Sequence, residues 1–267
     1  MREISNHNFI PKLTVITICY NDIEGLKATA KSMSQILKLN IEWVIIDGGS
    51  QDGTRQIIKD LGATQVVSEA DDGIYDAMNK GLMLSNGEYV MFLNSGDVLR
   101  SASAIELLLN DDFDYSILYS DLIMKSQSGT TRIWNSGRYR KFLLLFGWMA
   151  PHPTFISKRK LALRYPFDTS KSISADYYSM LLQFNHTEEK DIYYHPKFTV
   201  TMELGGLSNR SLKNIFKANL QVITSLRQVY GYYPLWILII KPMSKLFQYR
   251  IFGNWWYPKS KTSLMLY

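Results

Sequence analysis

The sequence predicts an α/β fold with a mostly parallel central sheet. Apolar, β-branched runs alternate with segments of helical spacing over the first hundred residues, which is typical of a parallel sheet covered on both faces. The length of 267 residues allows a sizeable core. The single cysteine, Cys19, excludes an internal disulfide framework, and its apolar neighbours favour a buried thiol.

The first half of the chain supplies the elements of this sheet in order. Short apolar runs rich in Val and Ile predict four strands, at residues 13–20, 42–50, 63–69 and 87–97. The segments between them have helical spacing, at residues 24–38, 53–61 and 74–85. Each strand is thus followed by a helix before the next strand begins, as parallel pairing requires.

The second half is less regular. Residues 115–126 are typical of a further strand pair, and residues 133–165 are irregular and aromatic. Residues 174–184 have helical spacing, residues 193–209 predict a strand and then a glycine loop, and residues 211–229 predict an amphipathic helix. The other expected elements are therefore a helix, a strand and a long helix after an irregular region.

Polar residues follow each of the first four strands. They are Tyr20-Asn21-Asp22, Asp47-Gly48-Gly49-Ser50, Ser68-Glu69 with Asp71, and Asn94-Ser95-Gly96-Asp97. Any one of these loops is equally typical of a turn or a helix cap. Four at the same edge predict a binding site, because ligands of such sheets lie beyond the carboxyl ends of the strands. Carboxylate and amide oxygens suit Mg²⁺ or Mn²⁺ shared with substrate phosphates. Without a Walker or G-x-G-x-x-G motif, a mononucleotide or sugar nucleotide is favoured.

Several stretches resemble the inverting glycosyltransferases of family two, which have the GT-A fold. These stretches are "TVITICYNDIEGLKATAKSM", "EWVIIDGGSQDGT", "SEADDGIYDAMNKGLMLSNGEYVMFLNSGD", "PHPTFISK" and "ADYYSMLLQF". The resemblance covers residues 12–208 and is closest to the bacterial enzymes of surface polysaccharide synthesis. It implies transfer of a sugar from a nucleoside diphosphate sugar.

The resemblance also implies site residues. It places the nucleotide sugar at Tyr20, Asn21, Asp47, Ser50, Asp71, Asn79 and Asn94. Within this set Asp47 would bind the base, expected to be uracil, Asp71 the nucleoside, and Asn79 would lie near ribose or phosphate. Asp97 would bind the metal, Mn²⁺ or Mg²⁺. Two departures weaken the match: the acidic motif keeps only its last aspartate, and Met78 stands where many relatives have arginine.

Inversion calls for a base on the acceptor side, and the resemblance points to Asp176 in "SADYY". Without the resemblance, Asp176 could equally serve only to favour a helix N-terminus. His152, Gly205 and Gly206 are further candidates for contact with the acceptor or the diphosphate. The alternative for His152 is a structural role, and the alternative for the two glycines is an ordinary tight turn. Asp52, in the same loop as Ser50, could equally be only a helix cap.

The last part of the chain is basic and aromatic, and we expect a glycosyltransferase domain at residues 1–208 and a helical tail at 209–267. From Gly205 to Tyr267 there are nine Lys or Arg and no Asp or Glu, whereas residues 1–204 hold 21 basic and 24 acidic side chains. The apolar core of "YYPLWILIIKP" is too short to span a bilayer, which needs about 20 residues. Tyr, Trp and basic residues favour an anionic membrane surface, so the sequence predicts in-plane, monotopic attachment. Two alternatives are a tail packed on the body and a tail that forms a homo-oligomer interface.

The sequence therefore predicts a metal-dependent, inverting hexosyl- or N-acetylhexosaminyltransferase. Its donor is expected to be a UDP-sugar, and its acceptor a glycan on a polyprenyl diphosphate in O-antigen, capsule or exopolysaccharide synthesis. The start of the chain lacks the apolar core of a signal peptide, which favours the cytoplasmic face of the membrane. An acidic body beside an aliphatic tail excludes nucleic acid as a partner. A nucleotidyltransferase and a non-catalytic scaffold of the same fold are the alternative functions.

Overall fold

A computed structural model describes residues 10–125, 131–203 and 212–246. The strands are β1 (Leu13–Cys19), β2 (Ile41–Asp47), β3 (Gln65–Ser68), β4 (Tyr89–Phe92), β5 (Val98–Leu99), β6 (Ile117–Lys125), β7 (Thr131–Trp134), β8 (Ile156–Lys158) and β9 (Ile192–Glu203). The helices and 3-10 turns are α1 (Ile23–Met33), α2 (Thr54–Ile57), η1 (Ile58–Asp60), α3 (Ile74–Leu84), α4 (Ser103–Leu108), η2 (Lys141–Phe146), η3 (His152–Thr154), α5 (Arg159–Arg164), α6 (Ala175–Asn185), η4 (Glu189–Asp191), α7 (Leu212–Tyr230) and α8 (Ile237–Leu246).

The strands form one mixed sheet. Its order is β3-β2-β1-β4-β8-β6-β9-β5, and β7 pairs with β6 at the side. β3, β2, β1 and β4 are parallel, with Leu13 opposite both Ile41 and Tyr89. β8 then lies antiparallel between β4 and β6, and β6 runs parallel to β9. The predicted α/β fold with a mostly parallel central sheet is confirmed.

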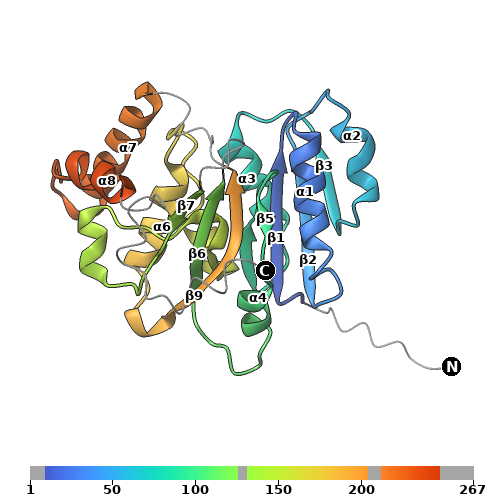
Figure 1. Ribbon diagram of the computed structural model, residues 1–267, viewed down its shortest axis with the longest axis horizontal. Helices are drawn as coiled ribbons and strands as arrows, with labels where there is room; N and C mark the ends of the chain where they lie inside the picture. Colours follow the sequence, from blue (N-terminus) through green and yellow to red (C-terminus); the bar gives the residue numbers. More distant parts are fainter. Residues whose placement is uncertain (1–9, 126–130, 204–211, 247–267) are drawn as a thin grey trace.

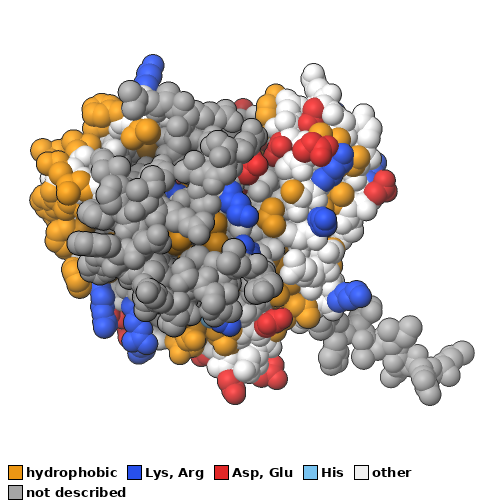
Figure 2. Space-filling view, viewed as in Figure 1, with side chains coloured by type: hydrophobic (Ala, Val, Ile, Leu, Met, Phe, Trp, Pro, Cys, Tyr) orange, Lys and Arg blue, Asp and Glu red, His pale blue; other side chains and the backbone are white. Residues whose placement is uncertain are grey.

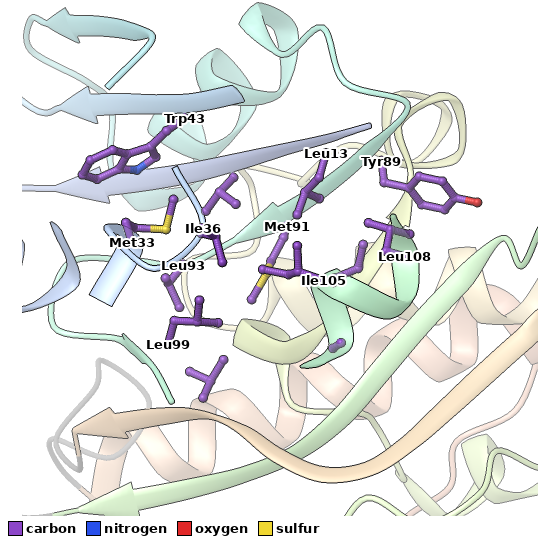
Figure 3. Packing of buried hydrophobic residues seen from close by; sticks show 14 of the residues in the cluster. Leu13, Met33, Ile36, Trp43, Tyr89, Met91, Leu93, Leu99, Ile105 and Leu108 are labelled. Carbon is purple, nitrogen blue, oxygen red and sulfur yellow. The ribbon is translucent and has the colours of Figure 1, made fainter. Parts of the chain in front are cut away.

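Both faces of the parallel strands are covered, as the continuous apolar runs predict. Along β1, Leu13 and Val15 point to one face, where they pack in a cluster with α1 and α4. Ile16 and Ile18 point to the other face and join a cluster with α3. Figure 3 shows the first cluster, in which the fully buried Trp43 lies beside Met33. The alternation follows from the two-residue repeat of a strand.

Two predicted elements differ from the structure. Residues 115–126 hold one long strand, β6, in place of a strand pair, and its antiparallel partner β7 comes after residue 130. The irregular region 133–165 contains β8, whose pairing with β4 and β6 joins the two halves of the sheet. β8 has only three residues, too few to show a strand periodicity in the sequence.

The beginning of the tail packs on the body. Val222, Ile223 and Leu226 of α7 and Ile237 of α8 are buried in one cluster with residues of β6 and α6. Figure 1 shows α7 and α8 beside α6, on the side of the molecule away from α2. The alternative in which the tail contributes to the core therefore holds for these residues, while the division at residue 208 stays a prediction.

Candidate active site

The loops after β1 and β2 are joined through the buried carboxylate of Asp47. Asp47 has no exposed surface, and its oxygens accept hydrogen bonds from the amide of Ser50 at 3.2 Å, from the Ser50 hydroxyl, and from the Ser68 hydroxyl at 2.6 Å. The Ser50 hydroxyl in turn accepts the amide of Asn21 at 2.7 Å. Because Asp47 has no exposed surface, a base could contact it only after the residues that cover it move. In this structure the carboxylate shapes the loops.

Tyr20, Gly48 and Asp71 come together at the same edge, where only Tyr20 is exposed. The Tyr20 side chain is 66% exposed. A Cβ atom built on Gly48 would lie 2.4 Å from the Asp71 carboxylate and 3.4 Å from the Tyr20 ring, so only glycine lets both groups cover this position. The other oxygen of Asp71 accepts the amide of Gly73 at 2.9 Å. An exposed ring beside a carboxylate suits a stacked base and the hydroxyls of a ribose.

Asp97 and Asn94 supply oxygen atoms suited to a divalent cation. Asp97 is 5% exposed, and its carboxylate accepts the amide of Asn94 at 3.2 Å. Burial raises the pKa of Asp97 to about 7, although that hydrogen bond opposes the shift. The side-chain oxygen of Asn94 is buried and has no hydrogen-bond partner within the described residues. An oxygen ligand without a partner and a buried carboxylate fit Mg²⁺ or Mn²⁺.

The described residues contain no cluster of three or more His, Cys, Asp or Glu side chains that could hold a metal. An ion held by Asp97 and Asn94 would therefore take its other ligands from the diphosphate and water, as Mg²⁺ commonly does. Asp22 lies in the same corner, where it caps α1 through the amide of Gly25 at 3.1 Å and accepts the Ser95 hydroxyl at 2.7 Å. It thereby ties the loop after β1 to the loop after β4.

Asn79 has a different environment from the one expected beside ribose or phosphate. Its amide nitrogen donates to the carbonyl of Phe167 at 2.8 Å, and its oxygen accepts the amide of Phe167 at 3.0 Å. Both ends of the side chain are thus used to hold residue 167 against α3. The neighbouring Lys80 forms ion pairs with Glu69 at 3.0 Å and Asp76 at 3.2 Å, so its charge is directed to the loop before α3.

Asp176 lies at the start of α6, close to α3 and η3. Its side chain is half-buried, and one oxygen accepts the hydroxyl of Tyr75 at 3.1 Å. The ring of His152 stacks on Phe92 at 5.4 Å and meets Phe167 edge-on at 5.8 Å. Burial lowers the pKa of His152, and the charge of Asp176 opposes that shift. The two side chains therefore interact electrostatically.

The last candidates from the sequence are Asp52 and the pair Gly205 and Gly206. Asp52 accepts the amide and hydroxyl of Thr54 and the amide of Ile23 at 3.0 Å, so it caps two helices. Gly205 and Gly206 lie outside the described residues. The sequence analysis missed Tyr75, although it lies in the "GIYDAMNKG" block that singled out Asn79.

Comparison with known proteins identifies the class. The family "Glycosyl transferase family 2" matches residues 14–177, more than half of the chain. The chain therefore belongs to glycosyltransferase family 2, and its α/β architecture is the GT-A fold of that family.

One sequence relative and two solved structures are similar to this chain. A PGL/p-HBAD biosynthesis glycosyltransferase of Mycobacterium bovis is 28% identical over 225 residues, which are 81% of this chain and 86% of the relative. The structure resembles residues 1–349 of TarS from S. aureus, with a TM-score of 0.60 and 17% identity over 81% of this chain and 65% of that one. Glucosyl-3-phosphoglycerate synthase from Mycobacterium tuberculosis, solved with Mn²⁺ and UDP, gives a TM-score of 0.58 and 18% identity over 82% and 80%.

Proposed function

We propose that this protein transfers a sugar, with inversion, from a nucleoside diphosphate sugar to a lipid-linked glycan in the synthesis of a bacterial surface polysaccharide. The observation that carries the proposal is the common edge of the sheet, where Tyr20, Asp71 and the Asn94–Asp97 loop lie at the ends of β1, β3 and β4. TarS has been solved with UDP and with UDP-GlcNAc, which supports a UDP-sugar as donor. The proposed sugar is a hexose or an N-acetylhexosamine.

The proposed reaction uses residues on two sides of the site, one facing the acceptor and one facing the donor. On the acceptor side, the oxygen of the acceptor hydroxyl bonds to the anomeric carbon, and Asp176 takes the proton of that hydroxyl. On the donor side, the bond from that carbon to the diphosphate oxygen breaks, and the nucleoside diphosphate leaves with the electron pair. Asp97 and Asn94 would hold Mn²⁺ or Mg²⁺, which when bound neutralises negative charge on the diphosphate.

Calorimetric titration with UDP, GDP and dTDP, each with and without Mn²⁺, tests the donor site. We expect metal-dependent binding of UDP, and loss of the metal dependence in Asp97→Ala. Preference for GDP or dTDP would retain a glycosyltransferase mechanism but contradict uracil as the base. If a folded sample binds none of the three, the non-catalytic scaffold becomes the better interpretation.

An apolar surface formed by η2, α8 and the two residues before α8 supports attachment to a membrane. Its exposed side chains are Phe142 (58%), Phe146 (45%), Leu235 (61%), Trp236 (42%), Ile239 (66%) and Met243 (52%). The Trp236 indole donates to the carbonyl of Leu145 at 3.1 Å, which holds the two segments together, and Figure 2 shows hydrophobic side chains gathered over this part of the molecule. Within the described residues, no helix is both long and apolar enough to cross a bilayer.

We therefore assign this surface to in-plane contact with the membrane that carries the lipid-linked acceptor. The test is co-sedimentation of the full chain with phosphatidylglycerol vesicles. In the double variant Leu235→Ser/Ile239→Ser we expect binding at least about tenfold weaker, because each buried aliphatic side chain contributes about 1.5–3 kcal/mol. Met83→Ser, at a residue of α3 that is 71% exposed, is the matched control. Equal binding of the double variant and wild type would contradict the assignment.

A further inference from the structure

Tyr75 connects the donor side of the site to the candidate base. It lies in the first turn of α3, which follows directly on the loop that carries Asp71. Its ring is buried and stacks on Phe167 with centroids 5.9 Å apart. Its hydroxyl reaches the start of α6, where it lies 2.6 Å from the carbonyl oxygen of Ile173 and 3.1 Å from an oxygen of Asp176.

The hydroxyl has one hydrogen and two acceptors within reach. A carboxylate is the stronger acceptor when it is charged, so the hydrogen favours Asp176 while that residue is ionised. Once Asp176 has taken a proton, the hydrogen of Tyr75 can turn to the carbonyl of Ile173, and the phenol oxygen can then accept the new hydrogen of Asp176, without movement of the ring. Burial and the charge of Asp176 both raise the pKa of Tyr75, so the phenol keeps its hydrogen throughout.

We infer that Tyr75 is a positioning residue that holds Asp176 in one place in both of its protonation states. The inference rests on the proposed function, because it takes Asp176 as the base. The two hydrogen bonds between Asn79 and the backbone of Phe167 support it, since they fix the segment that leads to α6 against the same helix. Of the titratable side chains described, Tyr75 on α3 and His152 on η3 interact with Asp176.

The first experiment compares Tyr75→Phe with wild type in the release of UDP from a panel of UDP-sugars, measured across pH. Phenylalanine keeps the stacked ring and removes the hydroxyl. The charged form of Asp176 then loses a donor, so the acidic limb of the pH–rate profile should move to higher pH, and kcat should fall about tenfold, a part of what a general base supplies. The calorimetric affinity for UDP should not change. Tyr89→Phe is the matched control, because Tyr89 is a buried tyrosine that donates to the carbonyl of Tyr115 at 2.8 Å.

A second substitution gives the opposite shift. 3,5-Difluorotyrosine at position 75 is a stronger donor than tyrosine, so the acidic limb should move to lower pH, which a loss of packing alone would not produce. An acidic limb that stays in place in both variants overturns the inference if Asp176→Asn is inactive. An active Asp176→Asn contradicts Asp176 as the base, and absence of UDP release in wild type contradicts the proposed use of a UDP-sugar, so failure of the inference and failure of the proposed function are distinguishable.

Discussion

The contact between Gly48 and Asp71 makes the nucleoside side of the site testable without removing a charge. In Gly48→Ala, the new Cβ would lie 2.4 Å from the Asp71 carboxylate, whereas real Cβ contacts stay above 3.0 Å. The carboxylate must therefore move by roughly 0.6 Å, the difference between these two distances. The methyl group lies in ordinary contact with the Tyr20 ring at 3.4 Å, so of the two proposed contacts of the nucleoside only the one at Asp71 is displaced.

The expected loss of UDP affinity is about tenfold, or about 1.4 kcal/mol. A hydrogen bond to a charged group contributes about 1.5–3 kcal/mol, and the displacement removes most of one such bond. The folded state should be little affected, because the closest atom to the new Cβ is the far end of the half-buried Asp71 side chain, which can move away. The assay is calorimetric titration with UDP and Mn²⁺, together with the thermal unfolding midpoint of the same sample.

Gly81→Ala provides a control with the same degree of overlap elsewhere. Its Cβ would lie 2.4 Å from a methyl carbon of Ile16, in the core between α3 and β1. Overpacking costs about 1–3 kcal/mol, of which about 1 kcal/mol is offset by the better helix propensity of alanine. This variant should lose stability and retain UDP affinity. Wild-type affinity in Gly48→Ala, with Asp71→Ala impaired, would refute the steric reasoning. If both Gly48→Ala and Asp71→Ala bind UDP as tightly as wild type, Asp71 does not belong to the site.

Three further predictions follow from buried polar groups. Burial alone would raise the pKa of Glu42, but hydrogen bonds from Thr14, Asn86 and Gln65 outweigh it and lower the pKa. The ionised Glu42 therefore stabilises the fold above its ordinary pKa of 4.5, and this stability is lost as the pH falls through the folded value. Urea unfolding should show Glu42→Gln about 2 kcal/mol less stable at pH 7, and the gap should close in acid; a gap independent of pH would contradict this. Asn79→Ala should lose about 1–2 kcal/mol of stability yet keep its UDP affinity. Weaker UDP binding would instead support the predicted contact between Asn79 and the nucleotide. Because the pKa of Asp97 is raised from 3.8 to about 7, thermal unfolding of the metal-free wild type should show a contribution to stability that is lost as the pH rises from the first value to the second, and Asp97→Asn should lack this contribution.

The sequence predicts the donor half of the fold well because its signals are local. Each strand from β1 to β4 is an apolar run closed by polar residues, and parallel pairing brings those ends to one edge. β8 could not be predicted, because three residues carry no periodicity and their partners lie in β4 and β6, far away along the chain.

In the candidate site, too, contacts between residues near in sequence could be predicted, whereas contacts between distant residues could not. Asp47 and Ser50 are adjacent in one loop, and the structure joins them. The role of Tyr75 depends on Ile173 and Asp176, about a hundred residues later. No local pattern reports a contact of that kind, whereas the tertiary structure shows it directly.

The buried carboxylate of Asp47 has a consequence for how substitutions at the donor edge combine. It accepts hydrogen bonds from Ser50 and from Ser68, and the thiol of Cys19 lies 3.7 Å away, so the ends of three strands share one acceptor. Groups that share a partner show interaction free energies of about 0.5–3 kcal/mol. A double-mutant cycle on Ser50→Ala and Ser68→Ala should therefore depart from additivity. A substitution at the end of one strand changes the effect that substitutions at the other two have on the free energy of unfolding.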